Sequence, residues 1–234
     1  MEALIKLENV WKIYQLGKIK LTILKNISLE IVPGAFVVIL GPSGSGKSTF
    51  LNMVGCLDLP TKGKVFLDGK DISKMSEDEL AQVRGKKIGF IFQQFNLLQN
   101  LNALENVMMP MIFQGKSEME RQERAKSLLT SFGLGERILH RPSELSGGEQ
   151  QRIAIARSLA NNPEIIVADE PTGNLDSTTG KKIMEILINL HQKEGKTIVV
   201  VTHDPIIANY SNQIINIKDG QLVSNHLIAE KVLW

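Results

Sequence analysis

The stretch GPSGSGKST at residues 41–49 constrains the fold most, because it sets a glycine-rich loop between a predicted strand and a predicted helix. The strand is expected at Ala35–Leu40, which is continuously apolar and β-branched, and the helix from Lys47. The loop fits G-x-x-x-x-G-K-[ST], in which glycines let backbone N–H groups point inward around a phosphate chain. A helix N-terminus adds favourable partial charge for an anion. The stretch therefore predicts a phosphate-binding loop rather than an ordinary glycine-serine turn.

Within this phosphate loop, Lys47 is expected to reach the terminal phosphates and Ser48 to ligate Mg²⁺. The motif alone indicates a nucleoside triphosphate and no more, since kinases, GTPases and motors share it. The expected nucleotide-binding residues of the loop are Gly41, Pro42, Ser43, Gly44, Ser45, Gly46, Lys47, Ser48 and Thr49.

The composition limits which classes of partner and which compartment are expected for the chain. Its 234 residues suit one domain, or one domain with a smaller lobe, and a net charge of +2 without a basic arm argues against nucleic acid. A single cysteine, Cys56, excludes an internal disulfide and fits a reducing compartment. The longest apolar runs, such as Phe36–Leu40, fall short of the roughly 20 residues that span a bilayer. We therefore expect a cytoplasmic protein without direct membrane insertion, which can still bind a membrane partner.

The hydrophobic pattern predicts strands and helices that alternate at both ends of the chain, as in parallel βαβ units, around a helical middle. Strands are expected at Leu4–Tyr14, Leu24–Ile31, Ala35–Leu40, Lys64–Leu67, Lys87–Phe92, Ile165–Ala168, Thr197–Val201 and, as a hairpin turning at Asp219-Gly220, within Gln213–Leu222. Helices are expected from Lys47 and at Ala103–Phe113, Glu118–Phe132, Gly148–Leu159 and Ser177–Gln192.

Two carboxylates follow the apolar strand at Ile165–Ala168. A strand parallel to the one before the phosphate loop would bring Asp169 beside Ser48, close to Mg²⁺. Glu170 comes next and can polarise a water for attack on the γ-phosphate. An acidic turn at a strand end is common, but the upstream phosphate loop favours the catalytic interpretation.

Four other side chains are weaker candidates by themselves. Gln93 follows a predicted strand and could touch the metal or the water, although the adjacent Gln94 competes for that role. His203 could hydrogen-bond the γ-phosphate, but a lone histidine at a strand end is usually structural or solvated. Tyr14 could stack on adenine, although core packing is the commoner role of such a tyrosine.

A second glycine-rich stretch, LSGGEQQR at residues 145–152, precedes another predicted helix. Ser146 can cap this helix, while Gly147 and Gly148 would expose its N–H groups to an anion. A simple helix cap is the ordinary alternative. The glutamines and arginine that follow make the combination a recognisable signature.

These motifs and their order resemble the ATP-binding subunit of an ABC transporter over essentially the whole chain. The matching pieces are Tyr14, GPSGSGKST, FQQ at 92–94, LSGGEQQR, IIVADEP at 165–171, NLD at 174–176 and THD at 202–204. The LSGG sequence distinguishes this family from most other phosphate-loop ATPases, which lack it. The resemblance implies an α/β phosphate-loop NTPase core with a parallel central sheet, an N-terminal antiparallel β subdomain and an inserted α-helical subdomain. It implies one domain over 1–234, with the core at 1–92 and 162–234 and the helical part at 93–161.

The resemblance also implies roles. Tyr14 would stack on adenine, Gln93 would sense Mg²⁺ and the transporter, and Glu170 would be the general base. Asp176 would lie at a dimer contact, and His203 would be the switch histidine. The metal ligands would be Ser48, Gln93 and Asp169. Two copies would pair head to tail, so that Ser146, Gly147 and Gly148 of one copy close on the ATP held by the phosphate loop of the other.

Finer matches are similar to the lipoprotein-release, macrolide-export and antimicrobial-peptide branch of prokaryotic ABC ATPases. They are GCLDLPTKGKVFLDG, IGFIFQQFNLL, ALENV and ADEPTGNLD, and Asn102 stands where Thr is usual but can equally cap the helix. This implies permease subunits and a peripheral place on the cytoplasmic face of the cell membrane. A non-transport ABC ATPase acting on DNA or ribosomes predicts a coiled-coil insertion, a tandem ATPase domain or a basic extension, none of which this sequence shows. A phosphate-loop kinase has no reason to carry LSGG.

Overall fold

The computed structural model describes residues 2–203 and 205–228. The chain forms two compact units. Unit 1 takes in Met1–Leu80 and Leu190–Trp234, and unit 2 takes in Ala81–Asn189. The division into a core at 1–92 and 162–234 and a helical part at 93–161 stays a prediction.

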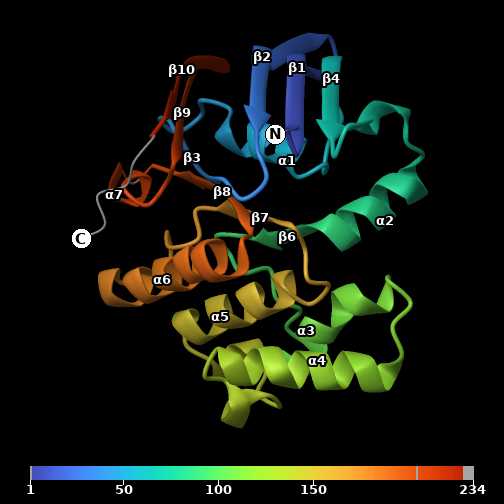
Figure 1. The fold of residues 1–234 in the computed structure, drawn as a ribbon, viewed down its shortest axis with the longest axis vertical. Coiled ribbons are helices and arrows are strands. Elements are labelled where there is room, and N and C mark those ends of the chain that lie inside the picture. Colours follow the sequence, from blue (N-terminus) through green and yellow to red (C-terminus); the bar gives the residue numbers. More distant parts are fainter. Residues whose placement is uncertain (1, 204, 229–234) are drawn as a thin grey trace. The chain divides into compact units, whose positions relative to one another are not determined.

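Unit 1 holds an antiparallel sheet and a second set of mainly parallel strands (Figure 1). The elements of unit 1 are β1 (Ile5–Leu16), β2 (Ile19–Ile31), β3 (Phe36–Leu40), α1 (Lys47–Val54), β4 (Lys62–Leu67), β5 (Lys70–Asp71), a 3₁₀ turn (Ile72–Lys74), β8 (Thr197–Thr202), α7 (Pro205–Ala208), β9 (Gln213–Lys218) and β10 (Gln221–Leu227). The antiparallel sheet has the strand order β2-β1-β4-β5. In the second set, β3 lies between β8 and β9 and is parallel to both, while β10 pairs antiparallel with β9.

The strands β3 and β8 form the core of the second set because their side chains are apolar on both faces. The first four residues of β3 and all of β8 are buried, as expected for strands of a covered parallel sheet. Their register pairs Leu40 with Thr202. The loops that leave the two strands therefore start level with each other, at one edge of the sheet.

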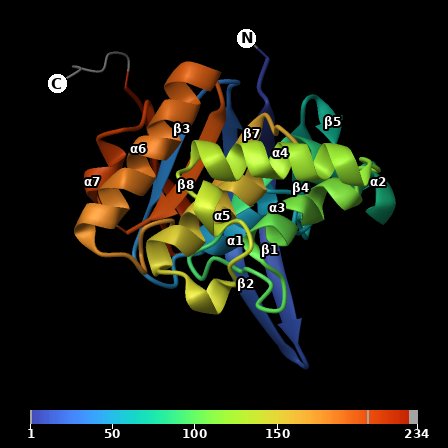
Figure 2. The ribbon, with the colours of Figure 1, turned by 90° about the horizontal axis from the view of Figure 1, so that it is seen from below.

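Unit 2 holds the parallel pair of β6 and β7 and three helices, α3, α4 and α5, that contact one another (Figures 1 and 2). Capping boxes start α3 at Asn102 and α4 at Ser117, which confirms the predicted cap at Asn102. The elements are β6 (Ile88–Ile91), α3 (Ala103–Ile112), α4 (Glu118–Ser131), 3₁₀ turns at Gly135–Arg137 and Pro142–Glu144, α5 (Gly147–Ser158) and β7 (Ile165–Asp169). Two further helices, α2 (Glu77–Lys87) and α6 (Ser177–Glu194), run across the unit boundaries.

Several elements differ from the sequence prediction: β5, α7 and the 3₁₀ turns were not predicted, and some strand ends are shifted. Two further differences have a clear physical reason. Helix α2 was not predicted, because none of its residues is buried and it therefore carries no apolar stripe. Its acidic first turn and basic last turn instead suit the helix dipole. Strand β2 begins at Ile19 rather than Leu24, because it pairs with β1 as far as the hairpin turn, where its residues are exposed and lack a buried face.

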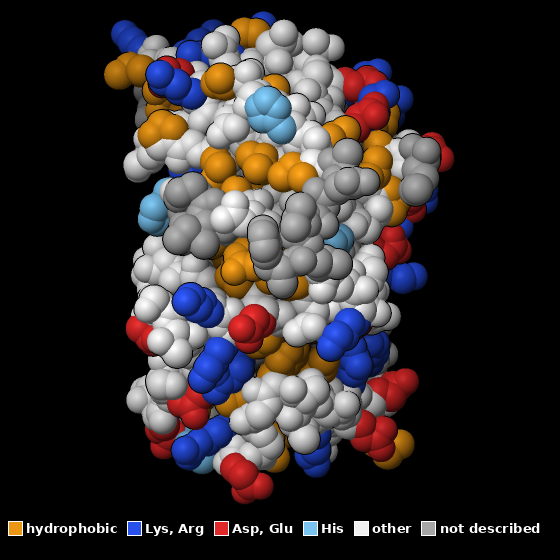
Figure 3. Space-filling model, turned by 60° about the vertical axis from the view of Figure 1, so that its left-hand side comes forward, with side chains coloured by type: hydrophobic (Ala, Val, Ile, Leu, Met, Phe, Trp, Pro, Cys, Tyr) orange, Lys and Arg blue, Asp and Glu red, His pale blue; other side chains and the backbone are white. Residues whose placement is uncertain are grey.

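The surface carries charges of both signs. On the face seen in Figure 3, acidic and basic side chains lie among one another rather than in one basic patch. No helix within the described ranges is long and apolar enough to cross a membrane.

The predicted hairpin of β9 and β10 turns at Asp219-Gly220 and supports the phosphate loop. The Gly220 N–H donates to the Ser45 carbonyl at 3.0 Å, and the Gly220 carbonyl accepts from the Lys25 N–H at 2.8 Å. Gly220 has a φ of +76°, and an added Cβ there would overlap the carbonyl oxygen of Ile23. This position therefore needs glycine for its backbone conformation and for the lack of space.

We expect Gly220→Ala to lower the free energy of unfolding by roughly 2–4 kcal/mol, the sum of left-handed backbone strain and a forced backbone shift. Gly17→Ala is the matched control, since Gly17 has a φ of +59° and nothing within 4 Å of an added Cβ. The control should lose only about 1 kcal/mol. Urea unfolding of both variants measures the difference, and equal losses would show that the close approach to Ile23 contributes nothing.

Candidate functional site

The phosphate loop in unit 1 has the backbone that its glycines permit. Gly44 and Gly46 lie in the left-handed region, with φ of +75° and +97°. Gly46 is the N-cap of α1, and an added Cβ there would lie 3.1 Å from the Ile23 carbonyl oxygen. The chain can thus turn from β3 directly into the N-terminus of α1, where unpaired backbone N–H groups attract an anion.

Lys47 lies inside the phosphate loop. Its Nζ donates to the carbonyl oxygens of Gly41 at 2.8 Å and Pro42 at 2.9 Å, and the residue is only 8% exposed. Ser45 adds a buried hydroxyl that has no hydrogen-bond partner in the described part of the chain. The loop therefore concentrates a cation and polar groups where a phosphate chain is expected.

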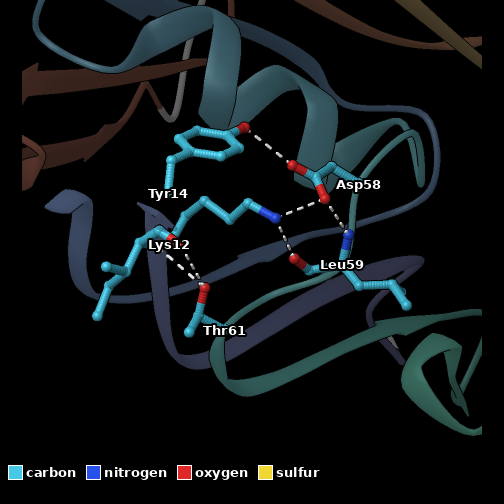
Figure 4. Close-up of polar contacts among 6 residues, drawn as sticks. Lys12, Tyr14, Asp58, Leu59 and Thr61 are labelled. Carbon is cyan, nitrogen blue, oxygen red and sulfur yellow. Dashed lines mark hydrogen bonds and ion pairs between the residues drawn. The ribbon is translucent and has the colours of Figure 1, made fainter. Parts of the chain in front are cut away.

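His203 and Tyr14 are the other predicted site residues of unit 1. His203 follows β8 and is exposed, at the same sheet edge as the phosphate loop, because β3 and β8 end level. Tyr14 lies in β1 and is 36% exposed, so it is not a core residue. Its hydroxyl donates to Asp58 Oδ2 at 2.9 Å (Figure 4). Asp204, the end of the predicted THD motif, lies outside the described residues.

In unit 2, β7 delivers the two predicted carboxylates. The strand ends at Asp169, and Glu170 follows with a φ of +48°, an uncommon conformation for a residue with a side chain. The Glu170 carbonyl accepts from the Gly173 N–H at 3.0 Å, which holds this turn. Strained backbone of this kind clusters at functional sites because it aims a side chain in one fixed direction.

Gln93 lies near these carboxylates, because β6 and β7 are parallel and Ile91 pairs with Ala168. The Asn174 side chain donates to the Gln93 carbonyl at 2.8 Å. An added Cβ on Gly173 would lie 2.9 Å from Gln93 Nε2, so the glutamine side chain lies against the turn that follows Glu170. This contact favours Gln93 over Gln94 for the predicted role.

The signature stretch starts α5 with a capping box. The Ser146 hydroxyl donates to Glu149 Oε2 at 2.7 Å and accepts from the Glu149 N–H at 3.4 Å, while the Ser146 N–H donates to the same carboxylate at 2.9 Å. These bonds from Ser146 lower the pKa of Glu149, against a smaller opposing effect of burial. The structure therefore shows the helix cap, and Ser146 is exposed at the surface of unit 2.

Asp176 caps the next helix, α6. Its Oδ1 accepts from the N–H groups of Thr178 and Thr179, both at 3.0 Å. The hydroxyl and N–H of Thr179 lower the pKa of this exposed carboxylate. Thr179 also approaches the signature, because an added Cβ on Gly148 would lie 2.6 Å from its Cγ2. The N-terminal ends of α5 and α6 are therefore in close contact.

Sequence reasoning missed Arg157, which ties α5 to the loop after Gln93. Its guanidinium donates to the carbonyls of Phe95, at 2.7 Å, and Asn96, and burial lowers its pKa. Both carbonyl-bearing residues have positive φ. A lone arginine within a helix carries no motif signal, and only the fold brings it to this loop.

The predicted Mg²⁺ ligands have suitable chemistry. Ser48, Gln93 and Asp169 offer hydroxyl, amide and carboxylate oxygens, the donors that Mg²⁺ prefers. No group of three or more His, Cys, Asp or Glu gathers into a metal site within the part of the chain that the structure describes.

Comparison with known proteins decides the family. The family model described as ABC transporter matches residues 24–173. The chain belongs to the ABC transporter family. An uncharacterized ABC transporter ATP-binding protein from Thermotoga maritima is 54% identical, over 95% of this chain and 94% of the relative. The macrolide export ATP-binding/permease protein MacB from a Shewanella species is 50% identical over 96% of this chain, which spans only 34% of MacB.

A solved structure of the ATP-binding cassette MJ0796 is similar over nearly the full length. It is a dimeric post-hydrolysis state bound to ADP and Pi, with a TM-score of 0.89, 50% identity, and coverage of 97% of this chain and 99% of that one. The likeness confirms the predicted α/β fold with parallel strands, an antiparallel N-terminal sheet and added helices. This ABC ATPase binds and hydrolyses ATP as a transporter subunit.

Ser117 and Ser146 both start a helix of unit 2 with a capping box, so the role of Ser146 in capping can be separated from a role in binding. We expect Ser146→Ala and Ser117→Ala each to cost about 1 kcal/mol of stability, because both exposed serines make the same cap. Only Ser146→Ala should also lower the ATPase rate, by roughly tenfold, if its hydroxyl contacts a charged phosphate. Thermal unfolding and steady-state hydrolysis measure the two effects. Equal rates for both variants would leave Ser146 as a cap alone.

Proposed function

We propose that this ABC ATPase binds Mg-ATP between two copies of itself arranged head to tail. The supporting observation is that the chain has two glycine-rich helix starts, one at the phosphate loop before α1 and one at Ser146–Gly148 before α5. Both favour an anion, and a single triphosphate needs only the first. The second is then available for the nucleotide of the partner, as the dimeric state of the MJ0796 relative supports.

The proposed roles follow from the chemistry of each side chain. Lys47 exchanges the carbonyls of Gly41 and Pro42 for the β- and γ-phosphates, and Tyr14 stacks on adenine. Ser48, Gln93 and Asp169 hold Mg²⁺, which neutralises phosphate charge when it is bound.

The reaction itself is hydrolysis of the terminal phosphate. Glu170 accepts a proton from the attacking water, and its fixed backbone aims the carboxylate. His203 donates a hydrogen bond to the γ-phosphate, and Asp176 lies at the contact between the two copies.

The capping box lets Ser146 serve both copies. To donate to a partner's phosphate, the Ser146 hydroxyl must give up only its bond to the Glu149 carboxylate, because its oxygen can still accept from the Glu149 N–H. The Glu149 carboxylate then keeps the Ser146 N–H, at 2.9 Å, and the Arg137 guanidinium, at 3.4 Å. The start of α5 therefore stays capped while the hydroxyl changes partner.

We further propose that the ATPase acts with membrane-spanning permease subunits on the cytoplasmic face of the cell membrane. The name of MacB joins an ATP-binding part to a permease, and this chain matches about a third of that protein. Export or extraction of lipoprotein, peptide or drug substrates fits this branch of the family. Neither direct membrane insertion nor a nucleic-acid partner is part of the proposal.

A Glu170→Gln variant tests the proposed dimer. The change keeps the size of the side chain and removes the base, so bound ATP should persist and hold two copies together. Light scattering with saturating Mg-ATP should give about twice the 26.0 kDa of the single chain.

Two controls isolate the cause of this dimer. Glu185→Gln makes the same change on an exposed site of α6 and should stay monomeric. Glu170→Gln combined with Lys47→Ala should also stay monomeric, because the phosphate contact is gone. A Glu170→Gln variant that binds ATP and remains a monomer would contradict the shared site.

A further inference from the structure

The ring of Tyr14 is held at two places. Its hydroxyl donates to Asp58 Oδ2 at 2.9 Å, and Lys12 Nζ lies 4.9 Å from the ring centroid, in the range of a cation–π contact (Figure 4). Tyr14 and Lys12 are on the same face of β1, two residues apart, whereas Asp58 comes from the loop after α1. A ring that is 36% exposed would otherwise be free to change rotamer.

Asp58 and Lys12 are also bound to each other. Lys12 Nζ lies 2.5 Å from Asp58 Oδ1 and donates to the Leu59 carbonyl at 2.9 Å. Their side chains are only 12% and 30% exposed, so solvent screens this pair less than a surface ion pair. One carboxylate oxygen of Asp58, Oδ1, thus contacts Lys12, and the other, Oδ2, accepts from the Tyr14 hydroxyl.

The loop that carries Asp58 is fixed to β1. The Leu59 N–H donates to Asp58 Oδ1 at 2.8 Å, and the Thr61 N–H donates to the Trp11 carbonyl at 2.8 Å. The Thr61 hydroxyl accepts from the Ile13 N–H at 3.0 Å and donates to the Ile13 carbonyl at 3.3 Å. Asp58 therefore offers the Tyr14 hydroxyl a stationary acceptor.

The protonation of Tyr14 suits this arrangement. Burial and the Asp58 carboxylate both raise the pKa of the Tyr14 hydroxyl, against a smaller opposing effect of Thr49. The hydroxyl thus remains a hydrogen-bond donor at neutral pH and above.

We propose that Asp58 and Lys12 are positioning residues that hold the Tyr14 ring in place for the base of the nucleotide, with Lys12 covering one ring face so that the base stacks on the other. The inference rests on the proposed stacking of adenine on Tyr14. Immobilising a free side chain on binding opposes affinity, and a ring that is already fixed avoids that loss. A purely structural tie between β1 and the loop requires only the Lys12–Asp58 pair and makes no use of the second oxygen of Asp58.

Calorimetric titration of the full chain with ADP and, separately, with inorganic tripolyphosphate tests the proposal, because the second ligand has no base. Tyr14→Ala should weaken ADP binding roughly tenfold, from lost stacking, and leave tripolyphosphate binding unchanged. Tyr14→Phe, Asp58→Ala and Lys12→Met should each weaken ADP binding about threefold, again without affecting tripolyphosphate. Lys6→Met removes the exposed ion pairs of Lys6 with Glu8 and Glu30 from the same strand, β1, and should change the affinity for neither ligand.

Double variants show whether Asp58 affects ADP affinity through the Tyr14 ring or through the loop that carries Asp58. Asp58→Ala should cause no further loss of ADP affinity in the Tyr14→Ala background. An equal loss in both backgrounds would overturn the positioning role.

The single variants separate this proposal from the proposed function. If Tyr14→Ala alone binds ADP normally, the stacking in the proposed function is wrong. If Tyr14→Ala weakens binding and Tyr14→Phe, Asp58→Ala and Lys12→Met do not, stacking stands and the positioning is wrong. Should Asp58→Ala fail to fold, Tyr14→Phe still tests the hydroxyl contact.

Discussion

A backbone-to-backbone approach that only glycine permits shapes the phosphate loop. An added Cβ on Gly41 would overlap the Ile217 carbonyl oxygen, and one on Gly220 would overlap that of Ile23. Because neither glycine has a side chain, the hairpin of β9 and β10 can lie against the loop, and the Gly220 N–H donates to the Ser45 carbonyl. Lys47 then closes the loop from inside through the Gly41 carbonyl. Residues about 175 positions apart in the chain thus build one cradle, which presents the N-terminus of α1 to phosphate.

Local sequence signals predicted much of the fold, because each depends on neighbours along the chain. The buried strands β3, β7 and β8 are continuous apolar runs, Asn102 and Ser146 are capping residues, and Asp219-Gly220 is a hairpin turn. Helix α2 escaped prediction because it buries nothing and so lacks a periodic apolar face. The family and its ATPase activity followed from the order of the motifs, and the comparisons confirm both.

Side-chain partners that are distant in sequence could not be predicted. Asp58 meets Tyr14 across 44 residues, and Arg157 meets the carbonyls of Phe95 and Asn96 across about 60. None of these contacts leaves a spacing pattern. They share one physical effect, since each removes freedom from a group near a proposed ligand: the tyrosine ring, or the loop that carries Gln93. The individual roles of the predicted site residues remain proposals, because they concern bound nucleotide.

In the proposed dimer, one ATP is shared by the phosphate loop of one chain and the signature stretch of the other. Gly147→Asp is a suitable signature variant, since an added Cβ there meets only side-chain atoms at 3.5 Å or more, and an acid at the start of α5 favours the helix dipole. The direct measurement is ATPase activity after mixing Gly147→Asp with Lys47→Ala. Each variant alone should be inactive, and an equal mixture should recover up to about a quarter of the wild-type rate, because half of the dimers are mixed and each has one intact site. No recovery on mixing, or a normal rate for Gly147→Asp alone, would contradict the shared site.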